Sequence, residues 1–133
     1  MLDTDVAIHL RDGDAFVAGE VARLDGAVLL SIITGVELEG GVYREPIHAP
    51  LRRARLDVML RAIPIVAFDD LAAEAYGAIV ARAGYSRRKL LDRMIAAQAL
   101  VHRATLVTLN ADDFSDVPNL PLLVFRPGRR EPR

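Results

Sequence analysis

The sequence contains no cysteine, and aromatic residues make up only 5% of its 133 positions. Without cysteine there is no disulfide framework, no thiolate metal site and no cysteine nucleophile. The low aromatic content argues against recognition of single-stranded nucleic acid by base stacking. No apolar run is long enough to cross a bilayer, and no basic leader precedes an apolar stretch. We therefore expect a cytoplasmic protein with no membrane contact.

Lysine is nearly absent, because Lys89 is the only lysine among the 17 basic residues. Many of the arginines are grouped, at 52–55, at 87–88 beside Lys89, and in the tail at 126–133. The net charge of −1 therefore does not exclude a surface that binds phosphate groups. Each group could equally be a solvated helix edge.

Hydrophobic residues make up 52% and charged residues 26% of the chain, which is typical of a globular protein. The length fits one domain with a substantial core, which we assign to residues 1–125. Residues 126–133 are polar and contain two prolines, so we expect a disordered tail there.

Apolar runs of strand length alternate with segments of helical spacing along the whole chain. The predicted strands cover the first residues and then 27–33, 63–68, 105–109 and 121–125, and the predicted helices cover 14–24, 34–43, 51–61, 69–82 and 91–100. Such alternation predicts an α/β fold in three layers, with a mostly parallel central sheet flanked by helices. Pro64 favours a sheet edge or a strand start for the segment 63–68.

Four carboxylates lie just beyond a predicted strand or near the start of a helix: Asp3, Glu37, Asp92 and Asp113. Each also has a purely structural interpretation. Asp3 could cap a helix, Glu37 could form a capping box with Thr34, and Asp92 could simply favour a helix N-terminus. Asp113 could cap a turn.

The joint placement of these acids is harder to explain by capping alone. Ligand sites in open α/β sheets lie outside the carboxyl ends of the strands. Carboxylates that meet there would repel each other unless a cation neutralised them. Mg²⁺ or Mn²⁺ suits oxygen ligands and can activate a water against a phosphodiester. No glycine-rich phosphate loop is present.

Four stretches carry a resemblance to a known family: residues 1–5 (MLDTD), 31–41 (SIITGVELEGG), 91–99 (LDRMIAAQA) and 104–114 (ATLVTLNADDF). They resemble the four motifs of PIN-domain ribonucleases, and more narrowly those of VapC-type toxins of bacterial toxin–antitoxin systems. The resemblance assigns catalytic and metal-binding roles to Asp3, Glu37, Asp92 and Asp113.

The resemblance also assigns supporting roles to polar residues beside the four acids: Thr4, Asp5, Thr108, Asn110 and Asp112. Asp5 departs from the family, which more often has Asn or Ser there. Asp112 beside Asp113 leaves the fourth ligand ambiguous by one position. Only two residues precede Asp3, so the first strand is short. A true start codon further upstream would lengthen it.

What the resemblance implies is a Mg²⁺- or Mn²⁺-dependent endoribonuclease that forms a homodimer and is inhibited by a cognate VapB-type antitoxin. Which RNA it cleaves cannot be read from the sequence. Arg87, Arg88 and Lys89 are close in sequence to Asp92, so we expect them to hold RNA phosphates near the metal.

Two other functions compete with this one. Residues 3–6 (DTDV) also resemble the opening motif of haloacid-dehalogenase-type phosphatases, but Glu37 would then have no task. A non-catalytic PIN-like module that binds RNA or a partner is the second alternative, and the presence of all four acids argues against it.

Overall fold

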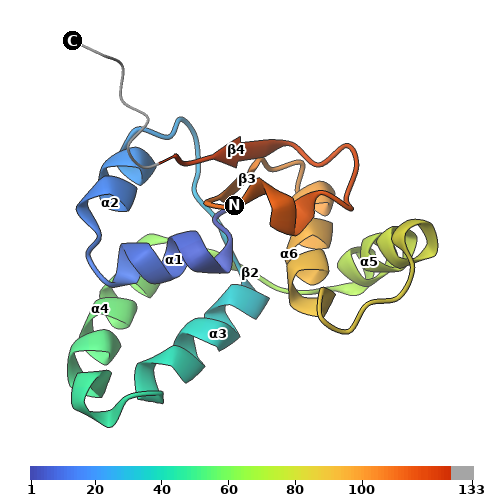
Figure 1. The fold of residues 1–133 in the computed structure, drawn as a ribbon. Coiled ribbons are helices and arrows are strands. Elements are labelled where there is room, and N and C mark those ends of the chain that lie inside the picture. The colour runs from blue at the N-terminus through green and yellow to red at the C-terminus, as the bar shows by residue number, and fades with distance from the viewer. Residues whose placement is uncertain (127–133) are drawn as a thin grey trace.

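A computed structural model describes residues 1–126, and residues 127–133 of the predicted tail lie outside this range. Six α-helices, four short strands and two 3₁₀ helices (η1 and η2) follow each other along the described chain (Figure 1). Their bounds are α1 Thr4–Arg11, α2 Ala15–Ala22, β1 Leu30–Ser31, α3 Ile32–Tyr43, η1 Pro46–His48, α4 Ala49–Ala62, β2 Ile65–Val66, α5 Asp70–Ala83, α6 Leu90–Val101, β3 Leu106–Thr108, η2 Ala111–Phe114 and β4 Leu122–Val124.

The strands form a parallel arrangement in which the N-terminal residues are central. β1 pairs with β2, and β3 pairs with β4, both in parallel. Leu2 forms parallel bridges to Leu30 on one side and to Val107 on the other, so it joins the two pairs. The resulting order, β2, β1, Leu2, β3, β4, confirms the predicted parallel sheet and leaves the proline-containing segment before β2 at an edge.

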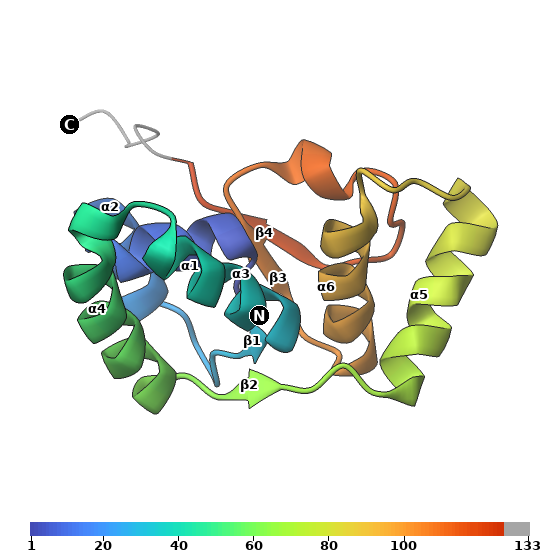
Figure 2. The same cartoon turned by 90° about the horizontal axis from the view of Figure 1, so that it is seen from below.

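Helices cover both faces of the strands, with α1 to α4 on one side and α5 and α6 on the other (Figure 2). Neighbouring residues of one strand point to opposite faces. Leu2 and Val107 accordingly belong to the core under α1 to α4, whereas Met1 and Leu106 belong to the core against α6. The predicted three layers are therefore present.

Several helices end at residues that typically cap helices. The Asp14 and Asp69 side chains cap α2 and α5, accepting hydrogen bonds from the amides of Val17 and Ala72. Gly84 ends α5 with a φ of 85°, a conformation that disfavours residues with a side chain. Within residues 1–126, no helix has the length and apolarity needed to cross a membrane.

The prediction of a strand over 27–33 is wrong except at residues 30–31, which form β1. β1 ends at Ser31, and α3 already begins at Ile32. The Ser31 hydroxyl accepts a hydrogen bond from the Ile33 amide at 2.9 Å, so the serine caps a helix instead of continuing a strand. Apolar residues alone could not show this change, because Ile32 and Ile33 suit either element.

Candidate active site

Asp3 lies where the Leu2 bridge ends and α1 begins, and only 4% of its surface is exposed. Its Oδ1 accepts a hydrogen bond from the Val6 amide at 2.9 Å, so it does cap α1. Burial raises the pKa of Asp3 to about 6, against hydrogen bonds from Thr108 and Val6 that lower it. The nearby charges of Asp5 and Asp113 raise it further. A helix cap needs neither burial nor neighbouring acids, so capping α1 does not by itself explain the environment of Asp3.

Glu37 is held by a contact that the capping-box interpretation did not foresee. Its Oε1 accepts a hydrogen bond from the Thr4 hydroxyl at 2.7 Å. The Thr4 and Thr34 hydroxyls lie 3.0 Å apart and share a second hydrogen bond. Because Ser31 caps α3, Thr34 lies inside the helix and the capping box of Thr34 and Glu37 is wrong. Thr4 therefore links the start of α1 to the second acid.

Asp92 lies in the first turn of α6 and is partly buried. Burial raises its pKa to about 6, and the charges of Asp113, Asp3, Glu37 and Asp5 raise it as well. The other three acids assigned as catalytic, Asp3, Glu37 and Asp113, therefore all act on Asp92. The fold brings together carboxylates that are up to 110 positions apart in the chain, counted from Asp3 to Asp113.

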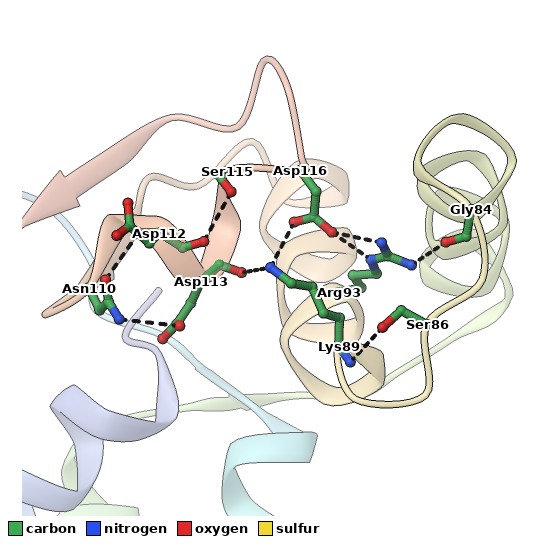
Figure 3. A network of polar contacts seen from close by, with 9 residues as sticks. All are labelled: Gly84, Ser86, Lys89, Arg93, Asn110, Asp112, Asp113, Ser115 and Asp116. Carbon is green, nitrogen blue, oxygen red and sulfur yellow. Dashed lines mark hydrogen bonds and ion pairs between the residues drawn. The ribbon is translucent and has the colours of Figure 1, made fainter.

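Asp113, rather than Asp112, is the fourth acid of this group. Its charge acts on both Asp3 and Asp92, and its Oδ1 accepts a hydrogen bond from Asn110 Nδ2 at 3.3 Å. Asp112 is exposed, and its amide donates to Asn110 Oδ1 at 3.1 Å (Figure 3). The backbone N–H of Asn110 in turn donates to the Thr108 hydroxyl at 3.0 Å. Both supporting residues, Thr108 and Asn110, therefore orient the η2 segment.

The atoms of this site that could bind a metal ion are all carboxylate oxygens. The site therefore concentrates negative charge. Among the described residues, no group of three or more His, Asp or Glu side chains is arranged to hold a metal ion. Mg²⁺, however, is commonly bound by one or two carboxylates together with several waters. Carboxyl groups whose pKa values are raised by burial and mutual repulsion gain from a nearby cation. The donor set therefore fits such an ion.

The basic residues near α6 divide into two kinds. Arg87 and Arg88 are exposed in the segment before the helix. Lys89 points inward, with its Nζ 3.5 Å from the Asp113 carbonyl oxygen and 3.7 Å from Asp116 Oδ1 (Figure 3). The predicted phosphate-binding role thus suits the two arginines better than the lysine.

Three buried or partly buried polar residues around the site escaped the sequence analysis. Arg93 forms an ion pair with Asp116, at 2.8 Å between Nη2 and Oδ2. Burial works against the ionised form of Asp116, but the Arg93 hydrogen bond and the charges of Lys89 and Arg93 hold its pKa below the ordinary value. Gln98 accepts from Ser31 and donates to the carbonyls of Val66 and Ala67. For Arg93 and Gln98 the available signal was a charged or amide residue on the otherwise apolar face of α6.

A comparison with known protein families identifies the family of this chain. A model of the PIN domain matches residues 1–120. The chain belongs to the PIN-domain family. It is 28% identical over 129 residues to ribonuclease VapC2 of Rickettsia felis, covering 92% of this chain and 94% of that protein.

Solved structures of two bacterial proteins have a similar fold. The structure of VapBC2 from Rickettsia felis bound to a promoter DNA fragment matches with a TM-score of 0.82 at 25% identity, covering 95% of this chain and 98% of that one. FitAcB from Neisseria gonorrhoeae matches with a TM-score of 0.77 at 27% identity, covering 92% and 94%. The resemblance to PIN domains, and to VapC among them, is confirmed.

Proposed function

We propose that this PIN-domain protein is a Mg²⁺- or Mn²⁺-dependent endoribonuclease and the toxin of a VapBC-type toxin–antitoxin pair. The observation that carries the proposal is the meeting of Asp3, Glu37, Asp92 and Asp113, with the pKa values of Asp3 and Asp92 raised to about 6. Similarity to ribonuclease VapC2 over most of both chains supports RNA as the substrate. The phosphatase alternative is not supported, because the chain belongs to the PIN-domain family over residues 1–120.

The four acids would hold the metal ion, and Asp3 and Asp92 are its best candidates because burial gives them the most to gain from a cation. When bound, such an ion lowers the pKa of a water and stabilises charge on the scissile phosphate. Thr4 keeps Glu37 oriented, at 2.7 Å, and Asn110 orients Asp113, at 3.3 Å. No nucleophile from the protein is needed.

RNA would reach this acidic group with help from positive charge beside it. Arg87 and Arg88 are exposed directly before α6, whose first turn carries Asp92. Their guanidinium groups would hold backbone phosphates and offset the repulsion between RNA and the carboxylates.

The principal test is cleavage of a pool of total RNA by the purified protein with Mg²⁺, with Mn²⁺ and with EDTA. We expect cleavage that requires metal and is lost in Asp92→Asn and in Asp113→Asn. The neighbouring Asp112→Asn should keep most of the activity, and Glu74→Gln, on the exposed side of α5, should keep all of it. Binding of RNA without cleavage under every condition would instead support the non-catalytic module.

The partner proposed is a VapB-type antitoxin, and the proposed assembly of the toxin is a homodimer. The structures matched at a TM-score of 0.82 and 0.77 are of VapBC2 and FitAcB. Co-expression with the antitoxin gene expected beside this one should yield a complex that no longer cleaves RNA, and sedimentation of the toxin alone should report twice the 14.6 kDa chain mass. A monomer, or a complex that still cleaves, would contradict these assignments.

A further inference from the structure

A continuous chain of polar contacts joins the segment that carries Asp113 to the helix that carries Asp92. Figure 3 follows it from Asn110, through Asp113 and Lys89, to Asp116, Arg93 and finally Gly84 at the end of α5. We propose that the ion pair of Arg93 and Asp116, together with Lys89, is a positioning device that sets the distance between the third and fourth acids. This inference rests on the proposed function and adds residues that act through Asp92 and Asp113.

The buried guanidinium of Arg93 binds two segments at once, through Asp116 after η2 and through Gly84 at the end of α5. Its side chain is 4% exposed. Nε and Nη2 each lie 2.8 Å from Asp116 Oδ2, and Nη1 donates to the Gly84 carbonyl at 2.6 Å. The planar fork of arginine can make these contacts at once, whereas the single ammonium of a lysine cannot. Arg93 directly follows Asp92, so contacts that fix the Arg93 side chain restrain the backbone that carries the third acid.

Lys89, which precedes Asp92 in the sequence, contacts η2 and the same segment after it. Its Nζ lies 3.7 Å from Asp116 Oδ1 and 3.5 Å from the carbonyl oxygen of Asp113 itself. Asp116 Oδ1 is buried without a hydrogen bond in the described residues, so Lys89 supplies the charge it faces. Asp116 thus receives one cation on each oxygen, both from the start of α6.

Stability alone is a weak explanation for this arrangement. A buried ion pair commonly contributes little to folding, because desolvation of the two charges offsets their attraction. What this pair does supply is a defined geometry between η2, a four-residue 3₁₀ helix, and the first turn of α6. Groups that orient metal ligands in this way typically change metal affinity by about 10-fold to 100-fold when they are removed.

The test compares Mn²⁺ binding by calorimetry in the wild-type protein, Asp116→Asn, Arg93→Lys and the double variant. Asp57→Asn is the matched control, because it breaks an ion pair with Arg53, at 2.7 Å, on the exposed side of α4. We expect Mn²⁺ affinity to fall about 10-fold to 100-fold in both single variants. The double variant should be no weaker than the worse single variant, because the two residues act as one unit.

Two further measurements separate positioning from folding and from RNA binding. Steady-state cleavage by Asp116→Asn should show a lower kcat with KM for RNA unchanged. Amide hydrogen exchange in the metal-free protein should become faster at residues 111–115 and stay unchanged across the remaining helices. Asp57→Asn should match the wild type in all of these measurements.

Mn²⁺ affinity of Asp116→Asn within twofold of the wild type would overturn the proposal. So would exchange that is unchanged at 111–115, or that rises equally across the whole domain. A wild-type protein that neither binds Mn²⁺ nor cleaves RNA would refute the proposed function instead. The exchange measurement needs no metal, so in that case it still decides whether the ion pair holds the η2 segment.

Discussion

Removing the charge of Asp3 should make the metal-free protein more stable at neutral pH. The pKa of Asp3 rises from an ordinary 3.8 to about 6, chiefly because the carboxyl group is buried. A difference of this size corresponds to about 3 kcal/mol between the two protonation states. Asp3→Asn keeps an oxygen that can accept the hydrogen bond from the Val6 amide, so the cap of α1 is retained.

The sign of the pH dependence follows from that raised pKa. In the folded protein Asp3 keeps its proton up to pH about 6, whereas in the unfolded chain it loses the proton near 3.8. The contribution of Asp3 to stability is therefore fully present below pH about 4 and is lost as the pH rises through about 6. Asp3→Asn should be close to the wild type at pH 4 and more stable by about 1–3 kcal/mol at pH 7.5.

Urea unfolding in EDTA at a series of pH values measures this difference directly. Glu74→Gln is the control, since it removes one carboxylate from an exposed position on α5. Asp92 titrates in the same range and is coupled to Asp3, so the measured midpoint belongs to the pair. A destabilised Asp3→Asn at pH 7.5, or a gain no larger than that of Glu74→Gln, would refute the reasoning.

Three other predictions concern metal binding and single side-chain contacts. Mn²⁺ at about 100 times its Kd should stabilise the wild type by about 2.7 kcal/mol, seen as a higher Tm, and leave Asp92→Asn unaffected; equal shifts would place the metal elsewhere. Thr4→Val removes the donor to Glu37 and should slow RNA cleavage about tenfold, with Thr4→Ser restoring it, while a fully active Thr4→Val would show that the contact is dispensable. Ser31→Ala loses the α3 cap and the donor to buried Gln98. Denaturant unfolding should therefore show a free energy of unfolding lower by about 1–3 kcal/mol, and an unchanged value would contradict the assigned cap.

Several features of the fold could be predicted because their causes are local. Alternating apolar and amphipathic segments predicted the order of strands and helices, and the parallel sheet followed from that order. Asp14, Asp69 and Gly84 lie at helix ends, where such residues are typical because each satisfies backbone groups within its own turn. The end of β1 was misplaced because the cap that ends it is one serine inside an apolar run.

The sequence by itself determined which chemical groups this protein has available and, through the parallel sheet, that its acids would gather at one place. Only the tertiary structure decided their environment. Burial, not residue type, raised the pKa of Asp3 and Asp92. The position of η2 selected Asp113 over Asp112, which are adjacent and chemically identical in the sequence.

The contacts that orient the acids were likewise beyond the reach of sequence patterns. Thr4 meets Glu37 across 33 positions, and Arg93 meets Asp116 across 23. Such pairs form because separate elements pack against a shared core, and no local periodicity records which side chains will then face each other. The acids could therefore be named from the sequence, whereas the residues that hold them in place became visible only in the folded chain.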